Sequence, residues 1–339
     1  MSTSSERARM PSIRDVARLA GVSHQTVSRV LNDHPSIRPE TKGRVLDAIR
    51  VLDYRPNVAA RALATSRSNI LGVLSATTGE FGPTSSIAAI EDAARAEGYS
   101  VSTLNLPDTT PEAIGAAVRQ LVGESVDGIV VLAPQVRVFN VLRGMAVTVP
   151  FVSLQTASGS DGFSHSADQL AGARMITEYL IRLGHSDILH LAGPQDWIEA
   201  ESRMRGYLDA MRDADLPTIP PIRGDWTADF GYFAGQELAR RRDFTAVFAA
   251  NDLMAIGLMQ GLQERGLKVP DNVSVIGFDN IFASALVTPG LTTVAAPLTM
   301  LGDSAVRWIT ATLTGNKGAD NVPVSVPVRL IVRGSTGPV

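Results

Sequence analysis

Residues 12–31 read SIRDVARLAGVSHQTVSRVL, and this stretch predicts two short helices joined by a tight turn. Gly21 is expected to end the first helix, because glycine readily adopts the left-handed backbone conformation common at helix C-termini. Ser23 is a suitable N-cap for the second helix. The apolar positions of the first helix recur at helical spacing and form one stripe: Ile13, Val16, Ala17 and Ala20.

The second helix of this pair has one apolar and one polar face. Its apolar face is expected to pack against the first helix through Val27, Val30 and Leu31. Its outer face holds side chains that can contact base edges or phosphates: His24, Gln25, Ser28 and Arg29. Any short helical hairpin has a glycine and two apolar stripes, so the polar outer face is what favours a DNA-binding helix-turn-helix.

Charge is divided unevenly along the 339 residues, whose formal net charge is −3. Residues 1–64 hold 11 Lys and Arg against 6 Asp and Glu, a net of +5, and the remainder holds 20 against 28, a net of −8. A basic head on an acidic body favours a head that meets polyanions, with an affinity that falls as salt rises. Small domains are often mildly basic by chance, so charge supports this reading without deciding it.

Composition limits the class of protein. The chain is long enough for two or three domains, and 45% of its residues are hydrophobic. No apolar run is long enough to span a membrane, and residues 1–11 are expected to form a disordered arm, since they lack the apolar core of a secretory signal. The absence of cysteine excludes disulfides, thiolate zinc sites and a cysteine nucleophile, and a cytoplasmic location is expected.

The remainder of the chain predicts a third head helix and an α/β body. The helix runs from Pro39 to about Val51, and YRPN at 54–57 ends it. Residues 58–64 predict a two-turn helix, too short to be stable alone. Strand-like runs at 70–75, 100–106, 128–133, 151–154, 188–192, 246–250 and 274–278 alternate with helical patterns. They predict two doubly wound subdomains of parallel strands, which bind ligands at their carboxyl ends.

Ordered motifs along nearly the whole chain resemble the LacI/GalR family of bacterial transcriptional regulators. In the head they are DVA at 15–17, AGVS at 20–23, TVSRVLN at 26–32 and YRPN at 54–57. In the body they are GH at 184–185, LAGP at 191–194, RMRGY at 203–207, ND at 251–252 and VIGFD at 275–279. The resemblance implies a DNA-binding head, a hinge helix and a core of two lobes, similar to periplasmic sugar-binding proteins, between which the chain crosses three times.

The resemblance also implies domain limits and an assembly. We expect a helix-turn-helix domain at 12–56, a hinge helix and linker at 57–69, and an effector-binding core at 70–339. Its first lobe covers about 70–164 plus 297–325, and its second about 165–296 plus the C-terminal segment. The chain ends at Val339 without the C-terminal helix that makes the family's founding member a tetramer, so a homodimer is expected.

By resemblance, His24, Gln25 and Arg29 face the major groove of operator DNA, unless some of them touch only phosphate. Gln can bind adenine and Arg guanine through two hydrogen bonds each. His24 replaces a tyrosine of the founding member, which implies a different half-site. The other DNA-binding positions implied are Ser12, Ile13, Ser23, Thr26, Ser28, Asn32, Tyr54, Asn57, Ala60 and Leu63.

Leu63 is the hinge-helix leucine of the family, which acts as a wedge in the minor groove, where unstacking costs a few kcal/mol and is offset by a better-wrapped duplex. From the sequence without the resemblance, a role of Leu63 as an ordinary core leucine would be as well supported as a role in DNA binding. Ala60 beside it lets two hinge helices pack closely. The symmetry of a dimer implies a palindromic operator.

The resemblance places a small-molecule effector in the core. Sugars present hydroxyl groups and apolar faces, so their sites combine charged and amide groups with an aromatic ring. Arg203, Asn251 and Asp279 match the family's hydroxyl-binding positions, and Trp226 matches an aromatic residue that packs on the sugar. Each of three residues also has a purely structural alternative. These are a helix N-cap for Asn251, a turn for Asp279 and the core for Trp226. Further candidates are Ala76, Glu80, Pro83, Phe163 and Gln155, the last in place of an aspartate.

These features predict a repressor of a carbohydrate-utilisation operon. A sugar, such as a galactoside or another disaccharide, is expected to bind the repressor and release it from its operator. A corepressor-dependent regulator that binds a purine or another small metabolite is the alternative. An enzyme fused to a DNA-binding head is disfavoured, because GxGxxG, P-loop and GxSxG motifs are absent and His165, His185 and His190 lack metal-ligand spacing. The basic head disfavours a sugar-transport protein, and no catalytic residue, metal or cofactor is expected.

Overall fold

A computed structural model describes residues 11–31, 36–54, 67–76, 81–133, 135–154, 164–194, 196–241, 243–316 and 325–339, without the side chains of residues 81–83 and 164. The chain divides into two compact units, residues 1–68 and 69–339, which we call the head and the core. Within the described ranges, no helix has both the length and the apolar character needed to cross a membrane.

In the described part of the head, the structure contains three of the predicted helices, α1 (Ile13–Ala20), α2 (His24–Leu31) and α3 (Pro39–Val51). The carboxylate of Asp15 accepts hydrogen bonds from the N–H and hydroxyl groups of Ser12, at 2.9 and 2.6 Å, and so fixes the start of α1. Gly21 ends α1 at φ +62°, and the Ser23 hydroxyl caps α2 by accepting from the N–H of Thr26. Among the described residues of the head, the buried ones are Val16, Ala17, Ala20, Val27, Val30, Val45, Ala48 and Tyr54.

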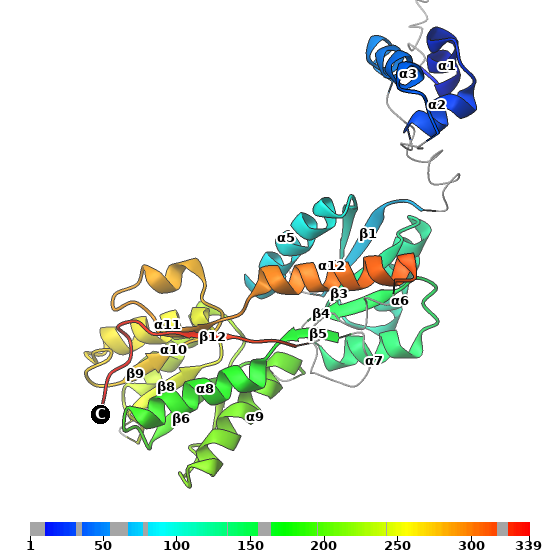
Figure 1. Cartoon of the computed structure of the whole chain (residues 1–339). Coiled ribbons are helices and arrows are strands. Elements are labelled where there is room, and N and C mark those ends of the chain that lie inside the picture. The colour runs from blue at the N-terminus through cyan, green and yellow to red at the C-terminus, as the bar shows by residue number, and fades with distance from the viewer. Residues whose placement is uncertain are drawn as a thin grey trace, which may run out of the picture. The chain divides into compact units, whose positions relative to one another are not determined.

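The first lobe of the core is built on a six-stranded parallel sheet in the order β11-β5-β4-β3-β1-β2. Helices α5 (Phe81–Ala96) and α12 (Leu298–Thr314) cover one face, and α6 (Pro111–Gly123) and α7 (Val136–Gly144) cover the other (Figure 1). The strands are β1 (Ile70–Ser75), β2 (Ser100–Asn105), β3 (Gly128–Leu132), β4 (Phe151–Leu154), β5 (Ser164–Ala167) and β11 (Ser325–Val326).

The second lobe has a four-stranded parallel sheet in the order β7-β6-β8-β9. Its strands are β6 (Ile188–Ala192), β7 (Ile222–Arg223), β8 (Ala246–Ala249) and β9 (Ser274–Ile276). Helices α8 (Gln169–Arg182) and α9 (Ile198–Asp213) pack on one face, and α10 (Ala228–Leu238) and α11 (Asp252–Glu264) on the other. A 3-10 helix, η1 (Phe282–Ala285), and an antiparallel pair, β10 (Thr293–Ala295) and β12 (Arg329–Ile331), complete this lobe.

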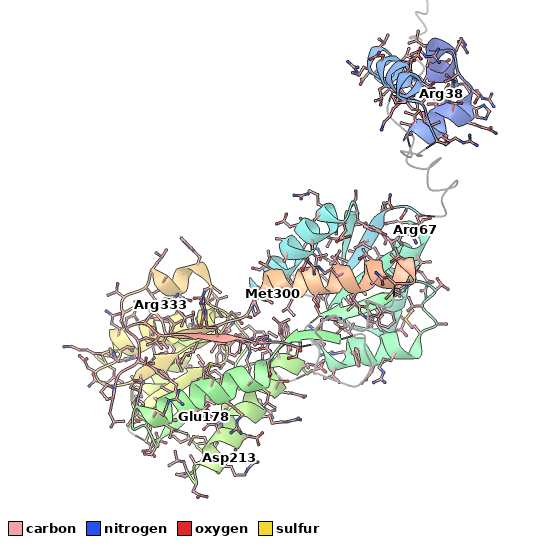
Figure 2. All side chains as sticks on the ribbon, viewed as in Figure 1. Arg38, Arg67, Glu178, Asp213, Met300 and Arg333 are labelled. Carbon is pink, nitrogen blue, oxygen red and sulfur yellow. The ribbon has the colours of Figure 1, made fainter. Side chains whose placement is uncertain are left out.

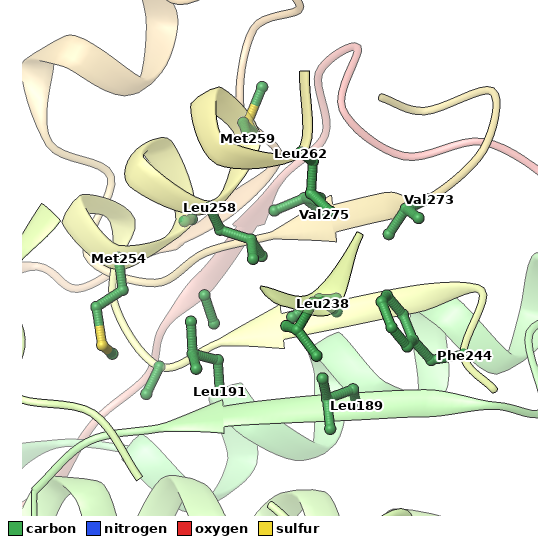
Figure 3. Packing of buried hydrophobic residues seen from close by; sticks show 14 of the residues in the cluster. Leu189, Leu191, Leu238, Phe244, Met254, Leu258, Met259, Leu262, Val273 and Val275 are labelled. Atoms are coloured by element: carbon green, nitrogen blue, oxygen red, sulfur yellow. The ribbon is translucent and has the colours of Figure 1, made fainter. Parts of the chain in front are cut away.

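The helix pairs of the second lobe are held in two different ways. Arg174 joins α8 to α9, because it donates to Asp213 at 2.8 Å as well as to Glu178 at 3.1 Å; both carboxylates are labelled in Figure 2. Helices α10 and α11 instead approach so closely that a Cβ atom on Gly257 would lie 2.0 Å from the carbonyl oxygen of Ala228. Beneath them, leucine, valine and methionine side chains fill the space above the sheet (Figure 3). Helices α10 and α11 therefore pack closely side by side over one face of the sheet.

The two parallel sheets confirm the predicted fold class. The chain passes between the lobes three times: after β5, between β10 and α12, and between β11 and β12. The first lobe extends slightly further than expected, because β5 pairs with β4, so the chain leaves this lobe after Ala167 rather than near residue 164. The N–H of Asp168 donates to the carbonyl of Val326 at 3.0 Å, which ties the first passage to the third.

Asp252, the first residue of α11, is a buried carboxylate that joins three segments. It accepts hydrogen bonds from the N–H of Ile281 at 2.9 Å and from the hydroxyls of Ser284 and Thr293 at 2.6 and 2.5 Å. η1 and β10 are thereby held against the start of α11. Burial away from water, with a contribution from the carboxylate of Asp279, raises the pKa of Asp252 to about 7, although its hydrogen bonds act in the opposite direction.

The raised pKa of Asp252 predicts a pH-dependent stability. Compared with the ordinary value of 3.8, the folded protein holds this proton to a higher pH. The contribution is therefore fully present below about pH 4 and is lost as the pH rises through about 7. We expect Asp252→Asn to gain stability relative to the unmodified protein between about pH 4.5 and 7.5, by at most about 1.4 kcal/mol per pH unit.

Urea unfolding of both proteins at three pH values in this range measures the difference. Burial lowers the pKa of His190 to about 4, so the contribution of His190 to stability rises with pH, opposite to that of Asp252. This contribution is common to both proteins and cancels in the difference. A difference in unfolding free energy that stays constant with pH would contradict the assignment.

Candidate functional site

The outer face of α2 presents three of the predicted DNA-reading side chains. His24, Gln25 and Arg29 are exposed, and Thr26 and Ser28 are partly exposed. The opposite face is anchored because Val27 is fully buried and Val30 is 5% exposed. Packing of α2 on α1 and α3 therefore sets which side chains face outward.

The remaining DNA-binding candidates divide into three groups. Ser23 is exposed and caps α2, whereas Ser12 caps α1 and Ile13 packs on the head's core. Tyr54 is only 8% exposed, so packing in the head accounts for its position, and its contact with DNA stays a prediction. Asn32, Asn57, Ala60 and Leu63 lie outside the described residues.

The effector candidates of the second lobe lie on loops that follow neighbouring strands. Trp226 follows β7, Asn251 follows β8 and Asp279 follows β9, all at the carboxyl edge of one parallel sheet. Ligands of doubly wound folds bind at this edge. Arg203 reaches it from the second turn of α9, which begins just after β6.

Arg203 is the centre of this edge and is 4% exposed. Its Nε donates to the side-chain oxygen of Gln169 at 2.8 Å, and its two terminal nitrogens donate to the carbonyl of Ala250 and, at 3.0 Å, to the carboxylate of Asp279. The guanidinium carbon lies 3.8 Å from the centre of the Phe278 ring. These contacts offset the cost of burying a cation and fix the guanidinium relative to Asp279.

Asp279 is partly buried, with 20% of its side chain exposed. Burial raises the pKa of its carboxyl group, and the adjacent Arg203 opposes this rise. Asp279 and Asn280 have φ values of +106° and +54°, a conformation that non-glycine residues seldom adopt and that often occurs at functional sites. Arg333 supports this turn by donating to the Asn280 side-chain oxygen at 2.7 Å.

Asn251 and Trp226 are both engaged within the protein. Asn251 caps α11 by accepting from the N–H of Met254 at 2.9 Å, and it donates to the carbonyl of Trp226 at 2.9 Å. Trp226 is 6% exposed, with φ at +72°, and its ring packs on the backbone of Gly193. The structural roles considered for both residues are therefore present, and their contact with an effector stays a prediction.

The other candidates give less information. Ala76 follows β1 at the carboxyl edge of the first sheet, where its N–H donates to the carbonyl of Leu132. Pro83 lies in α5. Glu80, Gln155 and Phe163 lie outside the described residues.

Sequence reasoning missed three polar or aromatic residues beside the second-lobe edge. Glu199 is 7% exposed and lies one helical turn before Arg203 on the buried face of α9. The four-residue spacing of a glutamate and an arginine on a buried stripe was a signal that could have identified it. Trp197, the N-cap of α9, and Gln135, the N-cap of α7, meet in an antiparallel bridge, and no pattern in the sequence indicates that contact.

The described ranges contain no group of three His, Cys, Asp or Glu side chains placed to bind a metal ion. His185 connects the C-terminal segment to the rest of the second lobe. Its ring lies 3.0 Å from the carbonyl oxygen of Gly337 in that segment and 2.8 Å from the hydroxyl of Thr245, just before β8. His190 is buried between Tyr207 and Phe248. Both rings have packing roles within the second lobe.

Comparison with known proteins assigns both units. Residues 12–57 match the sequence profile of bacterial regulatory proteins of the lacI family, and residues 177–336 match the periplasmic binding protein-like domain. The chain is 32% identical to catabolite control protein A of Priestia megaterium, an alignment that covers 96% of this chain and 98% of that protein. It is 33% identical to the lactose operon repressor of Escherichia coli strain K12, with coverages of 93% and 89%. It is 32% identical to the repressor PurR of Histophilus somni strain 129Pt, with coverages of 96% and 99%.

Solved structures agree with this assignment. The lac repressor dimer bound to operator and the anti-inducer ONPF matches with a TM-score of 0.88 at 30% identity, over 97% of this chain and 100% of that chain. A complex of the regulator CelR with cellobiose matches with a TM-score of 0.70 at 28% identity, over 96% and 99% of the two chains. The chain therefore belongs to the LacI family, as a DNA-binding transcriptional regulator with an effector-binding domain, and is not an enzyme.

Proposed function

We propose that this regulator represses a carbohydrate-utilisation operon in the cytoplasm and is released from a palindromic operator by a sugar inducer, such as a galactoside or another disaccharide. The observation that carries the proposal is the Arg203–Asp279 pair, held at the carboxyl edge of the second sheet with a separation of 3.0 Å. A guanidinium donates and a carboxylate accepts, so together they can bind neighbouring hydroxyl groups of one sugar ring.

Neighbouring groups support a sugar as the ligand. Asn251 follows Ala250, whose carbonyl oxygen accepts from Arg203, and the centre of the Trp226 ring lies 5.6 Å from the Arg203 guanidinium carbon. An aromatic ring next to charged hydrogen-bonding groups suits the apolar face and hydroxyl edge of a sugar. From the first lobe and the passage between the lobes, we propose that Ala76, Glu80, Pro83, Gln155 and Phe163 complete the site.

The relatives favour two kinds of effector. A lactose operon repressor and a regulator in complex with cellobiose support a disaccharide. A relative named PurR supports the alternative, a corepressor-dependent regulator that binds a purine or another small metabolite. The two kinds of effector have opposite effects on operator affinity, because an inducer weakens operator binding and a corepressor strengthens it.

For the DNA site, we propose a homodimer whose α2 helices enter successive major grooves of the operator. His24, Gln25 and Arg29 would contact base edges, and Leu63 would enter the minor groove at the operator's centre, next to Ala60. Backbone contacts would come from the remaining positions, namely Ser12, Ile13, Ser23, Thr26, Ser28, Asn32, Tyr54 and Asn57. A sugar bound between the lobes would shift the first lobes of the dimer and separate the hinge segments, coupling the two sites.

Replacement of Leu63 tests the proposed wedge. We expect Leu63→Ser to weaken operator binding by about tenfold or more, or about 1.4 kcal/mol, because a polar side chain loses the apolar contact with the unstacked bases. Sugar binding stays unchanged. Fluorescence anisotropy with the palindromic duplex measures the affinity, and Leu46→Ser, at an exposed position of α3, is the matched control. Equal operator affinities of Leu63→Ser and the unmodified protein would refute the wedge.

Replacement of Asp279 tests the proposed sugar site. We expect Asp279→Asn to bind lactose or cellobiose about 10- to 100-fold more weakly, because a hydrogen bond to a charged group contributes about 1.5–3 kcal/mol. Operator binding without sugar is retained. Isothermal titration calorimetry gives the affinities, and Asp213→Asn, at the exposed carboxylate that pairs with Arg174, is the control. The proposal fails if both variants bind the sugar as the unmodified protein does.

A further inference from the structure

We propose that Gln135 of the first lobe and the indole N–H of Trp226 in the second lobe form a two-sided subsite for one hydroxyl group of the effector. The inference rests on the proposed sugar site and adds to it a specificity-determining residue from the first lobe. Its starting point is a pair of buried polar atoms, one acceptor in the loop after β3 and one donor in the loop after β7.

The first observation is that both atoms are buried without hydrogen bonds. Gln135 and Trp226 are each 6% exposed. Among the described residues, neither the side-chain oxygen of Gln135 nor the indole nitrogen of Trp226 has a hydrogen-bond partner. Most buried polar atoms in proteins are hydrogen-bonded, and each exception calls for an explanation such as a missing ligand. A hydroxyl group both donates and accepts, so a single one can satisfy the pair.

The second observation is a contact that brings the two lobes together at this place. Gln135 and Trp197 pair in an antiparallel bridge, and the N–H of Val136 donates to the carbonyl of Asp196 at 3.2 Å. Arg137 forms an ion pair with the carboxylate of Asp196. The loop after β3 is therefore joined to the loop after β6 by backbone and side-chain contacts. We call this contact the interlobe clasp, made of residues 135–137 and 196–197.

The third observation links the clasp to the effector site. The ring of Trp197 lies 5.5 Å from that of Trp226, edge to face at 66°. Trp226 in turn lies beside the Arg203 guanidinium. Trp197 thus links the two residues: its backbone pairs with Gln135 of the first lobe, and its ring contacts Trp226 of the second lobe. A polar ligand that contacts both Gln135 and Trp226 also contacts both lobes, so its binding favours the clasped arrangement.

The surroundings of Trp226 indicate how it contributes. Its ring packs on Gly193, where a Cβ atom would lie 2.2 Å away, and its edge-to-face contact with Trp197 covers another part. With so little of the ring exposed, its donor group is the part left without a partner inside the protein. Trp226 therefore contributes a hydrogen bond as well as apolar contact, which favours polyhydroxylated ligands over purely apolar ones.

Two substitutions remove the proposed groups, and of these Gln135→Met keeps the length of the side chain, whereas Trp226→Phe also reduces the size of the ring. Gln135→Met removes the acceptor, and Trp226→Phe removes the indole N–H. The matched controls are Gln120→Met, on the exposed surface of α6, and Trp308→Phe, in α12 of the first lobe. Isothermal titration calorimetry of the full chain with lactose and with cellobiose measures affinity, and a thermal melt without sugar measures stability.

We expect Gln135→Met and Trp226→Phe each to bind the disaccharide about three- to tenfold more weakly, as for the loss of one neutral hydrogen bond. The fold-loss of disaccharide affinity in the double variant should be smaller than the product of the fold-losses in the two single variants, because one hydroxyl group bridges both side chains. The melting temperature of Gln135→Met should stay equal or rise, because an unpaired buried acceptor is removed. A merely structural glutamine would give the opposite, a lower melting temperature with unchanged affinity.

The outcomes separate this inference from the proposed function. If Gln135→Met binds the disaccharide as tightly as the unmodified protein while Asp279→Asn does not, the subsite is wrong and the sugar site stands. If neither disaccharide binds the unmodified protein, the disaccharide assignment fails, and the same titrations with glucose and galactose then decide the subsite. Unchanged monosaccharide affinity in Gln135→Met, or no binding of either monosaccharide, would overturn the inference. Should Trp226→Phe unfold, the affinity and melting temperature of Gln135→Met are sufficient.

Discussion

The buried guanidinium of Arg203 is the constraint around which the second lobe's edge is arranged. A buried cation has to be matched by acceptors, and here the acceptors come from the start of α8, the end of β8 and the loop after β9. The same contacts hold Asp279 in a left-handed backbone conformation, with further support from Arg333 at Asn280. The side chains of the proposed effector site are therefore held in place by contacts within the second lobe, an arrangement that lowers the entropic cost of binding a ligand.

A second set of contacts joins this edge to the rest of the core. Asp252 holds η1 and β10 against α11, and the interlobe clasp joins the loops that follow β3 and β6. Allosteric coupling requires an element with two arrangements whose balance both sites influence. In the coupling proposed above, the interlobe clasp is our candidate for this element, because its ion pair is partly exposed, with 59% of the Arg137 side chain open to solvent.

Local signals in the sequence predicted the described helices of the head and most of the described strands. Caps and glycines act over three or four residues, so Ser12, Gly21 and Ser23 indicated the limits of α1 and α2, which the structure confirms. Buried parallel strands are continuous apolar runs, which made them recognisable. Contacts distant in sequence were beyond such reasoning: the pairing of β5 with the first sheet, the near-complete burial of Trp226 and the bridge between Gln135 and Trp197. The family resemblance named Arg203 and Asp279 but did not indicate that they pair.

The most direct test of the account is a selection of genomic DNA fragments by the purified full-length protein, without additions and then with lactose, cellobiose or hypoxanthine. We expect a palindromic sequence to be enriched without additions, and one of the disaccharides to abolish this enrichment. Enrichment that appears only with hypoxanthine would contradict the sugar-induced mechanism and indicate a corepressor. No enrichment under any condition would contradict operator binding by the head.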